Sequence, residues 1–193
     1  MAKFSVVFDA CVLHPAPLRD ALLRLALADL YKANWTHMIH EDWINEALVD
    51  SPELNSGAFE KDLRELSALM DNSVRDSLVS GFEHLIDGLN LPRLRERHVL
   101  AAAIRCNADA IVTKNLDHYP QEVLDTYGIE TIHPDDFIYL QIDMEPAKCC
   151  YVFQQLRAAL NKPAYSVEDL LSALLTQALP QTVSKLREYQ SLL

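Results

Sequence analysis

Residues 97–115 read RHVLAAAIRCNADAIVTKN and place a helical pattern directly before a strand pattern. Small apolar residues dominate 96–107 and predict a helix, and the run that follows predicts a strand at about 109–114. A second strand is expected at 4–9, FSVVFD, where β-branched and aromatic residues stop at Asp9. Strands that alternate with helices indicate a parallel sheet, so the sequence predicts an α/β fold.

Most of the other elements predicted up to residue 132 are helical. Pro15 and Pro17 should open a helix that runs to about Lys32. The other predicted elements are helices at 38–50, 58–71 and 121–127, a helical turn at 81–88 and a last strand at 129–132. Gly128 suits the position after a helix, because glycine adopts a left-handed conformation without strain.

A change of character after about residue 143 divides the chain into two predicted units, 1–143 and 144–193. The second unit is expected to be a small helical domain with helices at 145–160, 166–177 and 180–192. Ser166, followed by Glu168 and Asp169, predicts the N-cap of the middle helix. The second unit shows no catalytic constellation in its sequence.

The composition is that of a folded globular chain. Of the 193 residues, 50% are apolar and 23% are charged, so we expect a buried core and no extensive disorder. No apolar run approaches the roughly 20 residues that span a bilayer, and the N-terminus MAKFSVVFDA does not resemble a signal peptide. We therefore expect a cytoplasmic protein. The four cysteines form no C-x-x-C pair, and Cys11 and Cys106 are predicted to be buried thiols.

The net charge of −11 argues against a protein that holds nucleic acid by a broad cationic surface. A cluster of carboxylates around metal ions is compatible with this charge, and so is a basic binding partner. Net charge alone therefore does not choose between these functions.

Asp9, Asn115 and Asp117 each follow a predicted strand. In parallel sheets the active crevice forms beyond the carboxyl ends of the strands, so these residues should meet at one edge. Phosphodiester hydrolysis by divalent metals needs several carboxylates in one place. An unpaired Asp9 would be costly to bury, so we expect it to be partnered or metal-bound. The alternatives are that Asp9 caps a helix or turn and that Asn115 and Asp117 cap a loop.

Asp42 and Glu46 lie four residues apart and share one face of the predicted helix 38–50. That face flanks an apolar stripe of Ile39, Trp43 and Ala47, which places both acids at the rim of the core. The alternative for both acids is a solvated helix flank without further function.

Glu96 opens the predicted helix 96–107, where the helix dipole favours an acid without any functional need. Arg93, Arg95 and Arg97 surround it. One cation about 6 Å from a bound metal would cost roughly 3 kcal/mol per unit of charge. These arginines must therefore point away, contact phosphate or replace the metal.

Taken together, the segments resemble PIN domains, specifically the VapC-type toxin ribonucleases that carry a C-terminal helical extension. The likeness is carried by FDACVLHPAPLRD at 8–20, ANWTHMIHEDWI at 33–44, GFEHLIDG at 81–88, RHVLAAAIRCNADAIVTKNLDHYP at 97–120, GIETIHPDDF at 128–137 and LPQTVSKL at 179–186. The resemblance implies a three-layer α/β PIN-like fold, with a central parallel sheet flanked by helices. It also implies a Mg²⁺- or Mn²⁺-dependent endoribonuclease, the toxin of a type II toxin–antitoxin pair. Its partners would be RNA as substrate, a cognate antitoxin and a second copy in a homodimer.

The resemblance also assigns roles to residues of this chain. The implied metal ligands are Asp9, Asp42 and Glu96, and the implied catalytic set adds Asn115 and Asp117. Asp42 stands where the family usually has glutamate, and Glu96 where it usually has aspartate. His118 occupies a position that is often acidic, so the acid is displaced to Asp117. The secondary candidates are Glu46, Thr113 and His118, and the candidate RNA phosphate contacts are Arg93, Arg95 and Arg97.

Other functions stay open or are disfavoured by the sequence. A catalytically degenerate PIN domain that binds RNA or protein is the alternative, because the exchanged acids change ligand reach by a methylene. Phosphatases that begin with a strand ending in Asp need a second acid two residues later, where this chain has Cys11. Receiver domains need companion acids that are absent, although Lys114 is present. Four glycines build neither a P-loop nor a G-x-G-x-x-G turn, and no G-x-S-x-G elbow exists.

Overall fold

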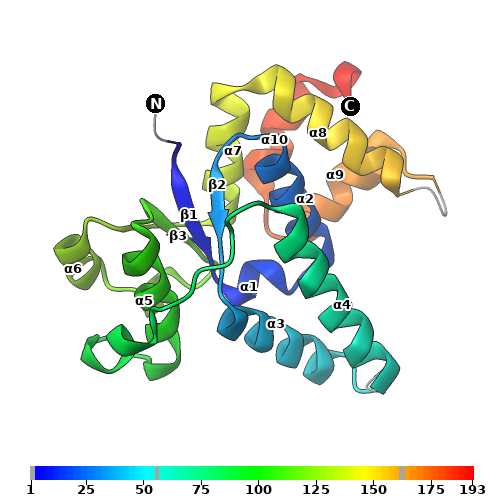
Figure 1. Cartoon of the computed structure of the whole chain (residues 1–193). Coiled ribbons are helices and arrows are strands. Elements are labelled where there is room, and N and C mark those ends of the chain that lie inside the picture. Colours follow the sequence, from blue (N-terminus) through cyan, green and yellow to red (C-terminus); the bar gives the residue numbers. More distant parts are fainter. Residues whose placement is uncertain (1–2, 55–56, 161–163) are drawn as a thin grey trace.

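The computed structural model describes residues 3–54, 57–160 and 164–193. Within this part, four parallel strands form one sheet in the order β2-β1-β3-β4 (Figure 1). The strands are β1 at Ser5–Phe8, β2 at Lys32–Asn34, β3 at Ala110–Val112 and β4 at Glu130–Ile132. The prediction of an α/β fold with a central parallel sheet is confirmed.

The two central strands are apolar and buried. All four residues of β1 and all three of β3 are buried, and Val7 pairs with Ile111 in the parallel register. Parallel strands are covered on both faces by helices and therefore read as continuous apolar runs. This is the reason that β1 and β3 were recognisable in the sequence.

Helices cover the sheet on both faces. In the sheet, β2 lies next to β1 at one edge, and β3 lies next to β1 on its other side. The connection from β1 to β2 therefore runs in the opposite direction to the connection from β2 to β3. Because such crossovers are right-handed, α2 at Ala16–Leu27 and α5 at Arg97–Cys106 lie on opposite faces. Figure 1 shows α5 and α6 on one side of the strands and α2 and α7 on the other. The predicted three-layer arrangement is therefore confirmed.

The remaining elements of this part surround these layers. The further α-helices are α1 at Ala10–Leu13, α3 at His37–Asp50, α4 at Gly57–Ser73 and α6 at Gln121–Leu124. The short 3-10 helices are η1 at Glu83–Gly88, η2 at Leu94–Glu96, η3 at Leu116–His118 and η4 at Asp125–Tyr127. Gly128 follows η4 with a φ of 66°, as expected for the residue that ends a helix.

The predicted helix from Pro15 to about Lys32 is too long. It ends at Leu27, Asp29 turns the chain with a φ of 67°, and Lys32–Asn34 forms β2. The three residues of β2 include no β-branched or aromatic side chain, so local pattern did not indicate a strand. Pairing with β1 makes this segment a strand, which is a tertiary effect.

Helix α7 at Pro134–Met144 was not predicted, and it connects the sheet to the C-terminal helices. The Phe137 ring lies 4.7 Å from the Tyr31 ring and 6.4 Å from the Phe8 ring, centroid to centroid. These edge-to-face contacts anchor α7 on the sheet.

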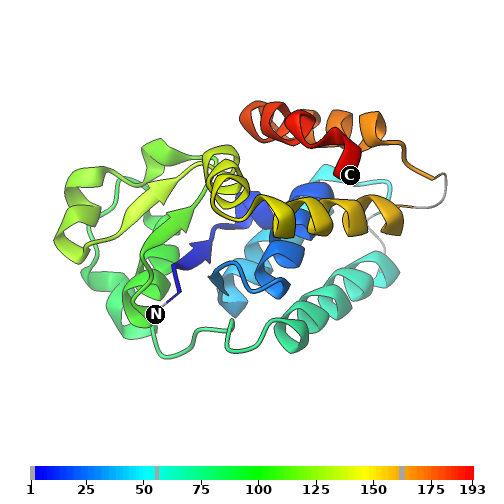
Figure 2. The same ribbon diagram turned by 90° about the horizontal axis from the view of Figure 1, so that it is seen from above.

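The helices after α7 form a C-terminal helical extension, as predicted. They are α8 at Pro146–Ala159, α9 at Val167–Thr176 and α10 at Pro180–Glu188, followed by η5 at Gln190–Leu192. Ser166 caps α9 in a reciprocal capping box with Asp169, which confirms the predicted N-cap. Figure 2 shows these helices lying together on one side of the molecule. None of the helices that the structure describes combines the length and the apolar character of a membrane span.

Asp135, near the start of α7, caps α10 from outside that helix. Its side chain is buried, and its two oxygens accept hydrogen bonds from the backbone N–H groups of Thr182 at 2.8 Å and Gln181 at 2.9 Å. The first N–H groups of a helix have no partner within the helix, so this carboxylate satisfies them. The contact fixes α10 against α7.

We expect Asp135→Ala to lower the free energy of unfolding by about 2–3 kcal/mol, because buried N–H groups lose a charged acceptor. Equilibrium urea denaturation followed by circular dichroism measures the change. Asp136→Ala is the control, since Asp136 is exposed and accepts a hydrogen bond only from the side chain of Gln181 among the described residues, so the backbone N–H groups of α10 stay capped. Its effect should stay below about 0.5 kcal/mol. Equal losses in the two variants would contradict the capping role of Asp135.

His40 on α3 lies in a hydrogen-bonded network that joins α3 to α4. Its Nε2 is 3.0 Å from Asp71 Oδ1, and Trp43 Nε1 donates to its Nδ1 at 2.8 Å. Nδ1 accepts that proton only while the imidazole is neutral. Burial lowers the pKa of His40, and Asp71 only partly opposes the shift, which agrees with a neutral ring.

The lowered pKa of His40 predicts an acid-dependent loss of stability. The unfolded imidazole titrates near pH 6.5, so below this value the unfolded chain binds a proton that the folded protein resists. Stability should therefore fall as pH drops through about 6.5. His40→Gln removes the titration, so its deficit relative to the wild type should shrink from alkaline to acidic pH. Thermal melts across the range measure this, and a deficit that does not change with pH would rule the assignment out.

Candidate functional site

The carboxyl ends of β1 and β3 meet at Asp9. Asp9 is 4% exposed, and its backbone N–H donates to the carbonyl of Val112 at 3.1 Å. The hydroxyl of Thr113 donates to Asp9 Oδ2 at 2.7 Å and accepts the backbone N–H of Asn115 at 3.0 Å. The structure therefore brings together the two strand ends that the sequence predicted to converge.

Cys11 completes the immediate surroundings of Asp9. Its Sγ lies 3.4 Å from Asp9 Oδ2 and 3.4 Å from Thr113 Oγ1, and the backbone N–H of Lys114 donates to it at 3.3 Å. Burial, followed by the charge of Asp9, raises the pKa of the thiol to about 12, so Cys11 stays protonated and donates to the carboxylate. Cys11 and Cys106 are only partly buried, which corrects the prediction of buried thiols.

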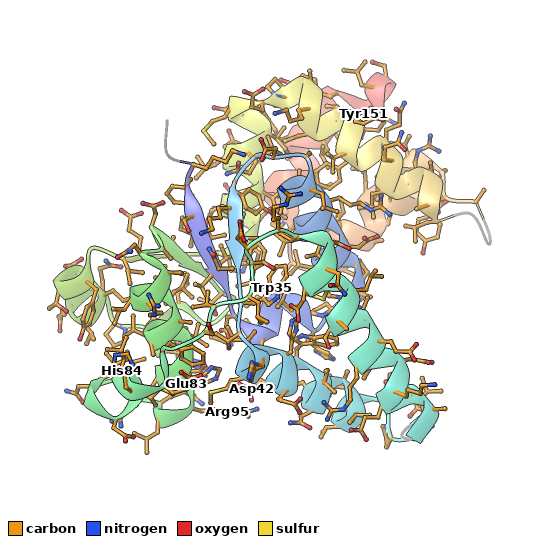
Figure 3. All side chains as sticks on the ribbon, viewed as in Figure 1. Trp35, Asp42, Glu83, His84, Arg95 and Tyr151 are labelled. Atoms are coloured by element: carbon orange, nitrogen blue, oxygen red, sulfur yellow. The ribbon has the colours of Figure 1, made fainter. Side chains whose placement is uncertain are left out.

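Asp42 on α3 is held by two side chains from the segment that leads into α5. His98 Nε2 donates to its Oδ2 at 2.9 Å, and Arg95 Nη2 donates to its Oδ1 at 3.2 Å. Partial burial raises the pKa of Asp42, but the hydrogen bonds and charges of His98 and Arg95 outweigh this effect and hold it below its ordinary value. Figure 3 shows the labelled side chains of Asp42 and Arg95 next to each other beside α3.

Glu96 precedes α5 at the N-cap position, but its side chain does not cap the helix. His118 Nδ1 donates to its Oε1 at 3.0 Å, and the Tyr119 hydroxyl donates to its Oε2 at 3.3 Å. Burial raises the pKa of Tyr119 well above its ordinary value, and the charges of Asp9 and Glu96 add to the shift. The Tyr119 hydroxyl therefore contacts Glu96 and interacts electrostatically with Asp9.

Glu46, one turn after Asp42 on α3, interacts electrostatically with Asp9 and Asp42. Burial raises its pKa, Arg95 lowers it, and the carboxylates of Asp9 and Asp42 raise it again. Asp9, Asp42, Glu46 and Glu96 are therefore electrostatic neighbours, linked through Arg95 and Tyr119. The predicted placement of Asp42 and Glu46 at the rim of the core is confirmed, since both are half-buried beside buried apolar residues of α3.

Some of the predicted site residues stand apart from this cluster. Asp117 is exposed on η3 and makes no hydrogen bond or ion pair within the described part of the chain. Arg93 is also exposed and makes no hydrogen bond or ion pair with the described residues. The Nε atom of Arg97 is buried without a hydrogen-bond partner among the described residues. Of the three options for the arginines, Arg95 takes the place of a cation on Asp42, while Arg93 points into solvent.

The chemistry of these side chains suits a hard divalent cation, because carboxylate oxygens are its preferred ligands. In the described conformation, however, Asp42 and Glu96 direct their oxygens to internal donors. Among residues 3–54, 57–160 and 164–193, no group of three or more His, Cys, Asp or Glu side chains is arranged to hold a metal. A metal ion would therefore need at least one of these carboxylates to exchange its partners.

His98 and Tyr119 belong to the site, but sequence reasoning did not identify them. His98 stands directly after the Glu96–Arg97 pair, and Tyr119 directly after His118. The only signal in the sequence was their proximity to candidate acids. Which carboxylate each contacts depends on how α3, α5 and η3 pack.

A parallel sheet in the order β2-β1-β3-β4, flanked by helices and with a buried acid at the end of its first strand, is consistent with a PIN-like α/β domain. The family model described as VapC50 C-terminal domain matches residues 134–188, which contain α7 to α10. A protein of Mycobacterium tuberculosis named "Putative ribonuclease VapC50" is 37% identical over 116 residues, which cover 60% of this chain and 68% of the relative. The chain belongs to the VapC-type family of PIN-domain proteins. No solved structure matches it.

Thr113 carries a testable part of this geometry. We expect Thr113→Val to lower the free energy of unfolding by about 2 kcal/mol, because Asp9 loses a donor and the N–H of Asn115 loses an acceptor. Thr113→Ser keeps the hydroxyl and should retain most of the stability. Urea denaturation of the two variants measures the difference. If serine and valine destabilise equally, the hydroxyl does not hold the strand ends together.

Proposed function

We propose that the protein is a metal-dependent endoribonuclease that hydrolyses RNA phosphodiesters. The observation that carries this proposal is the buried carboxylate of Asp9 at the meeting point of β1 and β3, with Asp42, Glu46 and Glu96 as charged neighbours. A site of this kind suits phosphodiester hydrolysis with a divalent cation. The relative named as a ribonuclease supports RNA as the substrate class.

Asp9, Asp42 and Glu96 are the residues that would hold Mg²⁺ or Mn²⁺. When bound, such an ion supplies an activated water and neutralises charge on the leaving oxygen. The cofactor is part of the proposal and rests on the oxygen-rich donor set. The ordinary geometry of Mg²⁺ leaves room for several waters, so one or two carboxylates suffice at a time.

The protein orients these carboxylates through their neighbours. Thr113 and Cys11 both donate to Oδ2 of Asp9, so Oδ1 is the oxygen available to a cation. His118 and Tyr119 hold the two oxygens of Glu96 in one orientation. Asn115 begins the loop after β3, and its backbone is tied to Thr113, so its amide would present a neutral oxygen at the same edge.

We also propose that the protein is the toxin of a type II toxin–antitoxin pair in the cytoplasm and forms a homodimer. Family membership supports the antitoxin as partner, and the net charge of −11 suits a basic partner. Arg93 is the arginine best placed to contact an RNA phosphate, because its side chain is exposed and makes no hydrogen bond or ion pair with the acidic cluster in the part of the chain that the structure describes.

A catalytically degenerate PIN domain that binds RNA or protein is the second candidate. The observation that favours it is the engagement of Asp42 and Glu96 by Arg95, His98, His118 and Tyr119. Such contacts would satisfy the acids without any metal. Cleavage assays distinguish the two candidates.

We expect Asp9→Asn to reduce RNA cleavage by about 100-fold or more, because even partners of metal ligands contribute 10- to 100-fold. The assay is cleavage of total RNA in Mg²⁺ or Mn²⁺, with chelator as the metal-free condition. Activity should disappear with the chelator and return with added metal.

Asp117→Asn is the matched control, since it removes an acid that is exposed and lies outside the cluster. It should retain most of the activity, and circular dichroism should show that both variants are folded. Cleavage that persists unchanged in Asp9→Asn would overturn the proposed site, because the activity would then not depend on Asp9. A folded wild type that binds RNA without cutting it would favour the degenerate domain.

A further inference from the structure

We propose that Arg95 is an internal cation that competes with the divalent metal for Asp42. Asp42 would become available as a ligand only when the guanidinium of Arg95 withdraws. This inference rests on the proposed function, because it concerns the same carboxylates.

The hydrogen bonds of Asp42 show which partner is able to leave. His98 Nε2 donates to Oδ2 at 2.9 Å, and the His98 side chain is only 6% exposed. Arg95 Nη2 donates to Oδ1 at 3.2 Å, and the Arg95 side chain is 64% exposed. The imidazole is buried, whereas the arginine reaches the carboxylate from solvent. Oδ1 is therefore the oxygen that a metal would obtain by displacing Arg95.

The charge of Arg95 acts on more than one acid of the cluster. Its guanidinium donates to Asp42, and its positive charge also acts on Glu46 and Glu96. One arginine therefore supplies positive charge to three acids that a metal ion would otherwise neutralise. A cation that remained there would also repel a divalent ion.

The guanidinium has an alternative partner in the substrate. Arginine binds phosphate oxygens with the same fork of N–H donors that it offers to carboxylates. Because Arg95 is largely exposed, it can turn from Asp42 to an incoming phosphate without leaving the site. Arg95 would then release Asp42 at the same time as its guanidinium binds an RNA phosphate.

The experiment measures Mn²⁺ binding to the full chain by isothermal titration calorimetry, without RNA. We expect Arg95→Gln to bind Mn²⁺ about tenfold more tightly than the wild type, a change of about 1.4 kcal/mol. Arg93→Gln is the matched control. It removes a positive charge from the same segment, and Arg93 is not among the hydrogen-bond partners of Asp42 in the described residues. Its affinity should stay within about twofold of the wild type, because exposed charges are screened by salt.

A second variant tests whether the gain passes through Asp42. In the double variant Arg95→Gln with Asp42→Asn, the tighter binding should be lost, since the released carboxylate is no longer present. Circular dichroism melts verify that each variant is folded. The expected result is therefore a gain in Arg95→Gln that is absent in Arg93→Gln and in the double variant.

The remaining outcomes distinguish this inference from the proposed function. Equal affinities of the wild type, Arg95→Gln and Arg93→Gln overturn the competition, while binding that Asp9→Asn abolishes leaves the metal-dependent nuclease intact. An equal gain in Arg93→Gln also overturns it, because net charge would then explain the change. If neither the wild type nor Arg95→Gln binds Mn²⁺, the inference and the metal dependence of the proposed function both fail.

Discussion

The hydrogen bond from Thr113 to Asp9 joins the carboxyl ends of the two central strands, and the candidate site depends on it. A carboxylate that is 4% exposed needs partners, because an unpaired buried charge is strongly destabilising. Thr113 and Cys11 provide donors, and the strand pairing of β1 with β3 places them there. The same contacts that satisfy Asp9 in the fold also orient its carboxylate. Stability and site geometry therefore have a common origin in the parallel pairing of two apolar strands.

The other acids of the cluster are satisfied by side chains rather than by solvent. Asp42 accepts hydrogen bonds from His98 and Arg95, and Glu96 accepts them from His118 and Tyr119. These donors offset the repulsion between the acid of α3 and the acid before α5. Internal donors of this kind stabilise an acidic cluster in the absence of other cations. They also set the conditions under which a metal could enter, because a metal must displace at least one of these donors. The affinity of the site for a metal ion therefore depends on how strongly these internal donors hold the carboxylates.

The C-terminal extension is attached to the sheet by specific contacts and not only by a linker. Phe137 packs edge-to-face against Phe8 and Tyr31, and Asp135, two residues earlier, caps α10. One helix therefore contributes both to the core of the sheet and to the extension. The match of a family model to residues 134–188 includes this helix. The division of the chain at residue 143 stays a prediction.

The sequence alone determined the elements whose local pattern is strong. Continuous apolar runs predicted β1 and β3, the Ser166 cap predicted α9, and the position of Asp9 after a strand predicted the edge at which the site lies. It did not determine β2 or α7, because Lys32–Asn34 has no strand propensity of its own and the 134–144 pattern lacked a recognised periodic signal. The roles of the site residues stay predictions. Only the tertiary structure decided that Arg95 and His98 hold Asp42, that His118 and Tyr119 hold Glu96, and that Asp117 stands apart. The physical reason is that hydrogen-bond partners separated by 22 to 56 residues are selected by how helices and strands pack, and sequence spacing carries no information about that packing.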